Sequence, residues 1–235
     1  MRSGSAEPAG SAGSEPETEL LAIDGRRLGL RAQQTRRRLL DATAELLGTA
    51  GILDLKVVDV ARRVGTSPAT FYQYFQNVEE AVLALADEVG GELHHVAAVL
   101  DEPWVGARSL LLARQLVDGF ISYWDDFRPV LRARNLAAQE GDQRFREVRV
   151  RALSTITDRL ADKVAEGQAA GKIAPEVTPY AAAGAMVAML ERMGDFHLEF
   201  EPRGVSREAM VETVARIVHQ TVTGRSATGP ARATH

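Results

Sequence analysis

Apolar residues recur every three or four positions along most of this chain, which is the spacing of helices with one buried face. No stretch keeps the strict polar–apolar alternation of a half-buried strand. Breakers separate the segments: Gly51 and Gly65 close the first two expected helices, and Pro175 stands between two later ones. The pattern therefore predicts an all-α fold of about nine helices.

Several helix starts can be located from capping residues. Serine, threonine and asparagine accept hydrogen bonds from the free N–H groups of a first turn, and proline suits the first helical position. We also expect one helix to lie between Pro103 and Pro129, because proline disrupts a helix interior. The expected caps are Ser67, Asn77, Thr178 and Ser206.

Composition divides the chain into four parts. Residues 1–30 and 225–235 are rich in Gly, Ala, Ser and Pro, and we expect them to be disordered tails. Residues 31–78 hold the first three expected helices as one small domain. Residues 79–224 hold the longer helices and form a second, larger helical domain.

Charge is distributed unevenly over these parts. The chain has a net charge of −4, yet residues 26–78 carry nine Lys or Arg against four acidic residues. A basic segment in an acidic chain indicates a polyanionic partner for that segment. There is no cysteine, no apolar run reaches the ~20 residues that cross a bilayer, and the N-terminus lacks the apolar core of an export signal. We therefore expect a cytoplasmic protein without a membrane partner.

The segment GTSPATFYQYF, which starts at Gly65, has the pattern of a helix-turn-helix. Ala61 and Gly65 suit a steep crossing of two helices, because the crossing needs a small side chain and the turn needs a positive φ. Phe71 and Phe75 then face the core. The side chains expected on the outer face are Thr66, Ser67, Thr70, Gln73 and Tyr74.

These outer side chains have the chemistry of a DNA contact. Gln73 can make a paired hydrogen bond to adenine, and the methyl groups of Ala69 and Thr70 can meet thymine methyls. Hydroxyl groups can hold phosphates without reading the sequence. Arg36, at the front of the first helix, supplies charge for the flanking strand. Aromatic side chains at helical spacing are usually core, and a run of arginines is more often solvated surface than a contact, whereas for the two tyrosines both interpretations stay open.

A series of motifs surrounds this segment: Gly51, V-D-V-A, G-x-S-x-x-T-aromatic-Tyr-x-Tyr-Phe and F-x-N-x-E-E. Through them residues 35–82 resemble the DNA-binding domain of the TetR family of transcriptional regulators. The resemblance implies a homodimeric repressor whose third helix reads a palindromic operator in double-stranded DNA, and a larger domain that binds a small-molecule effector. The DNA contacts that it implies are Lys56, Thr66, Ser67, Pro68, Ala69, Thr70, Tyr72, Gln73 and Tyr74.

Two positions depart from the family pattern. Val78 stands where a phosphate-binding Lys is usual, and Lys56 stands where Thr is common. We expect the operator still to be bound, with Lys56 and the nearby arginines covering part of the lost charge. Val78→Lys is therefore predicted to tighten binding and to steepen its salt dependence.

The last two expected helices have the character of a dimer interface. The segment YAAAGAMVAMLERM, from Tyr180, is small and apolar round much of its circumference, and MVETVARIVHQTV, from Met210, is amphipathic. Two such helices from each chain would form a four-helix interface, which suits a two-fold palindrome. Burial of the pair within one monomer is the alternative.

Aromatic and methionine side chains are concentrated in the larger domain, where they can line a cavity or simply fill the core. A cavity of this kind would favour a bulky, largely apolar ligand with little or no charge. The candidate effector-binding residues are Phe120, Tyr123, Trp124, Phe127, Asn135, Gln139, Met186, Met189, Met193, Phe196 and His197.

A helical metal-carboxylate enzyme is the main alternative function. Glu92 and His95 form one Glu-x-x-His unit, but di-metal proteins of this kind use two, and no second copy occurs. No phosphate-binding glycine-rich loop or nucleophile motif is present either. We expect no enzyme activity, no metal and no other cofactor. A helical adaptor that does not bind DNA is the remaining alternative, and the basic helix-turn-helix disfavours it.

Overall fold

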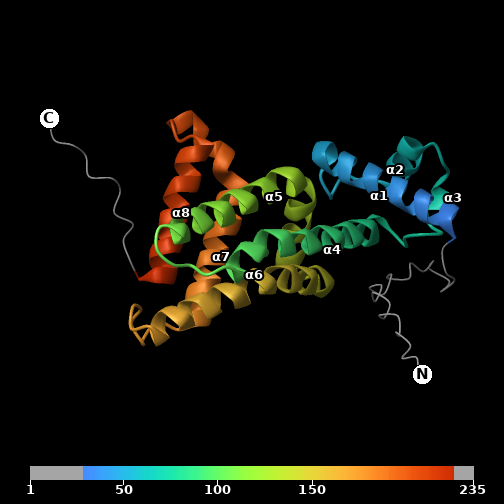
Figure 1. Cartoon of the computed structure of the whole chain (residues 1–235). Coiled ribbons are helices and arrows are strands. Elements are labelled where there is room, and N and C mark those ends of the chain that lie inside the picture. The colour runs from blue at the N-terminus through green and yellow to red at the C-terminus, as the bar shows by residue number, and fades with distance from the viewer. Residues whose placement is uncertain (1–28, 225–235) are drawn as a thin grey trace, which may run out of the picture.

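The computed structural model describes residues 29–224, which form eight α-helices, three short 3-10 helices and no strand (Figure 1). The all-α prediction is confirmed. The two expected tails lie outside the described residues, except for residues 29 and 30, which are the N-cap and the first residue of the first helix. The α-helices are α1 (Leu30–Ala50), α2 (Val57–Val64), α3 (Pro68–Phe71), α4 (Val78–Ala97), α5 (Arg108–Gln139), α6 (Gln143–Ala169), α7 (Pro179–Phe196) and α8 (Arg207–Thr223).

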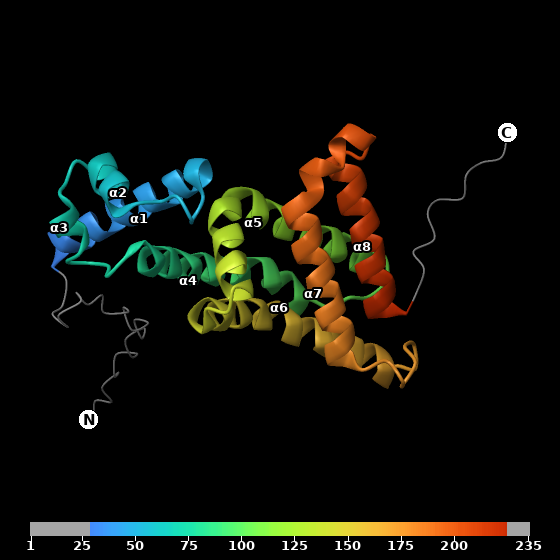
Figure 2. The same ribbon diagram turned by 180° about the vertical axis from the view of Figure 1, so that it is seen from behind.

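The expected helix end at Pro129 is wrong, because α5 continues through this proline to Gln139. An interior proline costs about 3 kcal/mol, since it removes one backbone hydrogen bond and its ring crowds the preceding turn. Val130 and Leu131, directly after it, are 3% and 0% exposed, and burying each stabilises by about 1.5–3 kcal/mol. Core packing thus offsets the break, and Figure 2 shows the later, yellow-green part of α5 running in a different direction from its green first part.

All four expected capping residues directly precede a helix, and three of them cap it with a side-chain hydrogen bond. The side chains of Ser67, Asn77 and Ser206 each accept a hydrogen bond from the N–H three residues later, at 3.2, 2.9 and 3.2 Å. Thr178 precedes α7, but its side chain makes no capping bond. The proline that follows it presets the first turn of α7 without that bond.

The helices form a small head and a larger body. The head comprises α1, α2 and α3 at one end of the molecule, and the body comprises α5 to α8 with α4 running from the head into it (Figure 1). α4 packs on α5 and α6, while α7 and α8 cover the far side of α5. One continuous apolar core runs through both parts.

Two arginines of α1 hold the head onto α4. The Nη1 of Arg37 donates to Oε2 of Glu88 at 2.7 Å, and the Nη1 of Arg36 lies 3.5 Å from Oε1 of the same carboxylate. The Arg36 guanidinium also lies over the ring of Phe75, 5.2 Å from its centroid. Glu88 therefore links the front of α1 to the middle of α4.

Candidate nucleic-acid interface and effector cavity

The turn between α2 and α3 has the geometry that its residues predict. Gly65 adopts φ 72° and ψ 38°, a left-handed conformation that is open to glycine. The N–H of Thr66 donates to the carbonyl of Ala61 at 2.9 Å and closes the end of α2. Ala61 is fully buried, which fits the small side chain needed where two helices cross closely.

The residues of α3 and the turn after it separate into an inner and an outer side. Phe71 and Phe75 are 0% and 4% exposed, and their rings lie 5.5 Å apart in the core of the head. Tyr72 is 52% exposed and Gln73 is exposed, whereas Tyr74 is partly buried against the core. The structure thus resolves the ambiguity of the two tyrosines by turning Tyr72 outward and Tyr74 half inward.

The other expected contacts surround α3. Ser67 and Thr70 interact with each other, because the Ser67 Oγ accepts from the Thr70 N–H and lies 3.2 Å from the Thr70 Oγ1. Lys56 precedes α2 and makes no ion pair with any of residues 29–224. The exposed members of the set are Lys56, Ser67, Pro68, Ala69, Tyr72 and Gln73, and the partly buried ones are Thr66, Thr70 and Tyr74.

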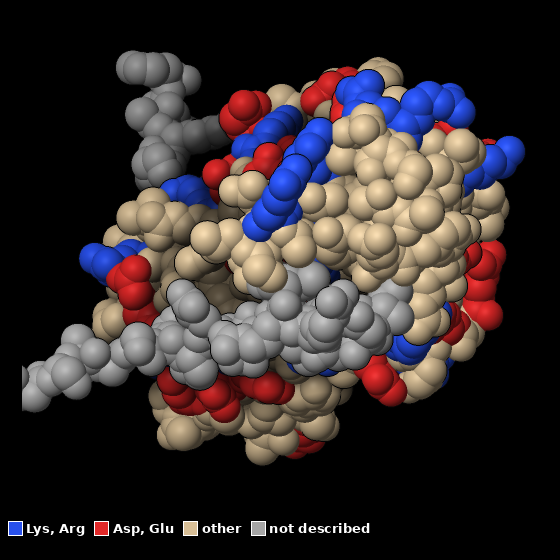
Figure 3. Space-filling model, turned by 90° about the vertical axis from the view of Figure 1, so that its right-hand side faces the viewer, with Lys and Arg blue, Asp and Glu red and all other residues tan. Residues whose placement is uncertain are grey.

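Arg36 lies apart from this surface. Its side chain is only 17% exposed and faces Glu88 and the ring of Phe75, so its charge is already engaged inside the molecule. Arg38 is engaged too, since it donates to the carbonyl of Val64 at 2.7 Å. Figure 3, which views the end of the molecule that carries the head, shows Lys and Arg side chains mainly along the upper edge, above a broad region without charged side chains.

Val78 is the first residue of α4 and is only 7% exposed. A lysine at this position would have to lead its ammonium group out of the core toward solvent. The valine therefore supports the packing between head and α4 at a position where the resemblance leads one to expect a phosphate contact.

A cavity of about 430 Å³ opens between α5, α6 and α7, and we call it the effector groove after the predicted effector-binding residues in its lining. Its volume lies in the range of about 300–1,000 Å³ that is typical of small-molecule sites. Four of the predicted effector-binding residues line it, namely Trp124, Asn135, Gln139 and Phe196.

The other seven predicted effector-binding residues do not line this groove. Most belong to the apolar core, which is the alternative that the aromatic and methionine pattern left open. Phe120, Tyr123, Met186 and His197 are buried, and Phe127, Met189 and Met193 are partly buried.

Charged residues that the apolar pattern did not indicate also line the groove. They could have been found from their spacing, because polar positions recur at intervals of three and four on α5, from residue 132 to 139, and on α7, from residue 191 to 195. This lining is more highly charged than the apolar lining that the aromatic and methionine pattern predicts. The additional charged residues are Arg132, Arg149, Glu191, Arg192 and Asp195.

Ion pairs fix several of these side chains. Arg132 donates to Asp195 at 2.6 Å, and Arg149 pairs with Glu191. Behind them Arg134 is 1% exposed and lies 3.5 Å from the same Glu191 carboxylate, and burial lowers its pKa. Burial also raises the pKa of the neighbouring Tyr123 to about 12, so its hydroxyl stays protonated.

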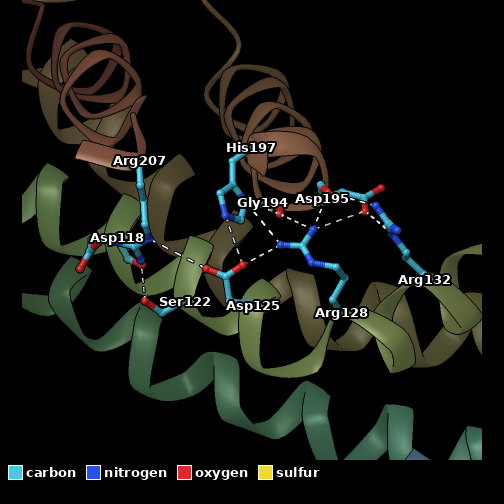
Figure 4. Close-up of polar contacts among 9 residues, drawn as sticks. All are labelled: Asp118, Ser122, Asp125, Arg128, Arg132, Gly194, Asp195, His197 and Arg207. Atoms are coloured by element: carbon cyan, nitrogen blue, oxygen red, sulfur yellow. Dashed lines mark hydrogen bonds and ion pairs between the residues drawn. The ribbon is translucent and has the colours of Figure 1, made fainter. Parts of the chain in front are cut away.

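A polar network beside the groove explains the position of His197 (Figure 4). The Nε2 of His197 lies 3.2 Å from Oδ1 of Asp125, and its Nδ1 lies 3.1 Å from the carbonyl of Gly194. Arg128 donates to the same carboxylate and carbonyl, at 2.6 and 3.1 Å. Arg207, at the start of α8, reaches the same stretch of α5. His197 therefore joins α5 to the end of α7.

Residues 29–224 contain no group of three His, Asp or Glu side chains placed to hold a metal ion. Glu92 and His95, the unit considered for a metal enzyme, are both exposed on α4. Within the same residues no helix combines the length and apolar character that crossing a membrane requires.

Solved structures show the same fold. A TetR-family transcriptional regulator from Rhodococcus sp., described as putative, has a TM-score of 0.63 at 20% identity over 81% of this chain and 99% of that one. The fatty acid degradation regulator FadR from Bacillus halodurans has a TM-score of 0.60 at 16% identity, over 85% and 97%. FadR from Bacillus subtilis, solved with stearoyl-CoA, has a TM-score of 0.60 at 16% identity, over 80% and 98%.

Family models match both parts of the chain. Residues 39–85 match the model for bacterial regulatory proteins of the tetR family, which covers the helix-turn-helix and the start of α4. Residues 96–229, more than half of the chain, match the tetracyclin repressor-like C-terminal domain. The protein therefore belongs to the TetR family and is a DNA-binding transcriptional regulator.

Proposed function

We propose that the protein is a homodimeric repressor that holds a palindromic operator with two heads and releases it when a small molecule occupies the effector groove. The outward face of α3 carries the proposal: Tyr72 and Gln73 are exposed while Phe71 and Phe75 anchor the helix from within. Residues 31–78 act as the DNA-binding unit, and residues 79–224 bind the effector and the second copy.

On DNA, Gln73 reads a base and its neighbours hold the backbone. A paired glutamine–adenine contact discriminates by about 1–3 kcal/mol, whereas hydroxyl and lysine contacts to phosphate fix position and register. Lys56 is suited to the second role because it is exposed and no carboxylate among the described residues pairs with it. Arg36 supports the head from inside and contacts DNA less than its neighbours do.

The exposed face of α7 supports a dimer through the last two helices. Ala181, Gly184 and Ala185 are exposed along it, and such small side chains allow a second helix to approach closely. On α8, Ile217 is 43% exposed, an apolar side chain that a partner would cover. A two-fold interface here carries two heads, which matches the two half-sites of a palindrome.

Effector and operator must weaken each other. A ligand shifts the protein away from DNA only if it binds the released conformation better than the DNA-bound one, and the coupling then holds in both directions. α4 connects the head to the body, which contains the groove. A change in the direction of α4 therefore alters the separation of the two α3 helices in the dimer.

Selection from a pool of random duplexes tests the DNA-binding part, and it requires no assumed operator sequence. We expect enrichment of an inverted repeat, and we expect Gln73→Ala to bind it about tenfold or more weakly. Gln115→Ala, an exposed glutamine of the body, is the matched control and should bind like the unchanged protein. Failure to enrich any inverted repeat, or equal binding by the two variants, would contradict the proposal.

Sedimentation tests the dimer. Ala185→Arg places a charge on the small-residue face and should yield monomers that bind the inverted repeat weakly. Ala98→Arg, at an exposed position after α4, should remain dimeric. A dimer that survives Ala185→Arg places the interface elsewhere.

A further inference from the structure

A second hollow lies between the head and the body, and we call it the junction notch. Its volume is about 290 Å³. Leu47 and Ile52, at and after the end of α1, form one wall, and Pro129 and Ala133 of α5 form the other. Its walls are largely apolar.

The junction notch and the effector groove meet on α5. Arg132 and Leu136 line both, and they lie one helical turn apart. Leu136 is 37% exposed, which leaves an apolar side chain uncovered between the two hollows. One elongated molecule can therefore occupy both by lying across this turn.

The effector groove has a surplus of positive charge. Arg132, Arg149 and the buried Arg134 share two carboxylates, Glu191 and Asp195. The guanidinium of Arg192, which also lines the groove, is a fourth positive charge. Two positive charges are thus left uncompensated in and behind the groove, where an anion would be attracted.

Arg192 is the accessible part of this surplus. Its guanidinium stacks on the ring of Phe196, 3.6 Å from the centroid, and it makes no ion pair within residues 29–224. Stacking holds the planar group in place while its N–H donors stay available for a carboxylate or phosphate. Buried behind the groove, one Nη of Arg134 also lacks a hydrogen-bond partner.

We infer that the groove and the notch together bind one elongated amphipathic anion, with its acidic head at Arg192 and Arg132 and its apolar chain in the junction notch. This inference rests on the proposed function, of which it names the effector class. It also supplies the coupling, because a chain in the notch lies between α1 of the head and α5 of the body. Occupancy pushes against the end of α1 directly.

Calorimetric titration with matched ten-carbon probes tests the acidic head. Decanoate and decyl phosphate should bind, whereas decanol should bind at least tenfold more weakly, and the two acids show whether carboxylate or phosphate is preferred. Arg192→Gln should weaken both acids about tenfold and leave decanol unchanged. Arg151→Gln, which alters an exposed arginine of α6 outside the groove, is the control and should change nothing.

The chain position is tested separately with Gly48→Leu. Gly48 lines the notch, and a Cβ there would lie 3.6 Å from Pro129 Cγ, so a leucine can fill the space without a backbone clash. The variant should lose most of the gain in affinity that decanoate has over acetate. Equal binding of decanoate and decanol, no binding of either acid, or an unaffected Gly48→Leu would each overturn the inference.

Operator binding without any probe separates this inference from the proposed function. A protein that selects an inverted repeat yet fails the probe tests is a repressor with another effector. A protein that binds the acids but selects no DNA loses the proposed function instead. If both hold, either acid should lower operator affinity by the factor by which operator lowers acid affinity.

Discussion

The head and the body build their candidate functional surfaces in opposite ways. In the head, neighbouring residues of one short element divide the work: Phe71 is fully buried and Tyr72, next to it, is 52% exposed. In the body, the groove draws on three helices and brings together residues as distant along the chain as Trp124 and Phe196. A surface made by one element is readable from local sequence, whereas a cavity depends on how elements pack.

The largest expected effect separates burial from contact within α3. Phe71→Ala removes a fully buried ring and should destabilise the head by about 3–5 kcal/mol. Tyr72→Ala should leave the denaturant midpoint nearly unchanged while it weakens operator binding. Chemical unfolding and operator titration of both variants measure the two effects. A stability loss in Tyr72→Ala similar to that in Phe71→Ala would show that the two sides of α3 are not distinct.

A second pair of variants examines packing in the body. A Cβ at Gly194 would lie 2.4 Å from the ring of Trp124, so Gly194→Ala forces α7 away from α5 and should cost about 1–3 kcal/mol. Gly91→Ala, on α4, meets nothing within 4 Å and should stabilise by about 0.5–1 kcal/mol. Thermal unfolding should therefore shift in opposite directions for the two. Equal shifts would contradict the close contact between α5 and α7.

Val78→Lys should have opposite effects on operator affinity and on the stability of the head. The charge should tighten operator binding and steepen the dependence of log K on log salt by about 0.9, the increment of one phosphate contact. The same change removes a buried valine, so the free energy of unfolding should fall. Unchanged operator affinity at several salt concentrations would show that position 78 does not face the phosphates.

The smallest expected effect is a pH dependence in the body. His219 is buried, with Nε2 2.9 Å from the Ser109 Oγ and Nδ1 without a hydrogen-bond partner. Burial lowers its pKa, and the charge of Arg216 lowers it further. Below a pH of about 6.5, His219 is therefore protonated in the unfolded chain but stays neutral in the folded one. The free energy of unfolding then decreases as the pH falls.

His219→Gln should reduce that decrease, because glutamine can still bond to Ser109 and does not titrate. Unfolding free energies measured at pH 7.5 and pH 5 provide the comparison. The variant should lose less stability than the unchanged protein between the two values. An equal loss would assign the acid sensitivity to other groups.

The head could be predicted from the sequence more fully than the body. The left-handed Gly65, the cap at Ser67 and the buried Phe71 are local features, each set by the conformational limits of one residue. They place the helix-turn-helix from sequence alone. The sequence also pointed to Arg36 as a contact, but its pairing with Glu88, over fifty positions away, could be seen only once α1 had docked on α4.

The groove could be predicted only in part. The predicted set includes four residues that line the groove, but most of the aromatic members pack in the core because an apolar side chain gains more from burial than from lining a polar cavity. The spacing of Arg192 on α7 indicates the face on which it lies but not what it faces. Its role depends on Phe196 one turn later and on the arginines that α5 and α6 place opposite.

The double attachment of Glu88 to Arg36 and Arg37 has a mechanical consequence. Because the Arg36 guanidinium also packs on the ring of Phe75, directly after α3, the helix α3 has little freedom to rotate independently of α1 and α4. Any tilt of α4 therefore moves the whole head as one rigid body. Because α3 lies at the far end of the head, a tilt too small to disturb the core of the body produces a larger displacement of α3.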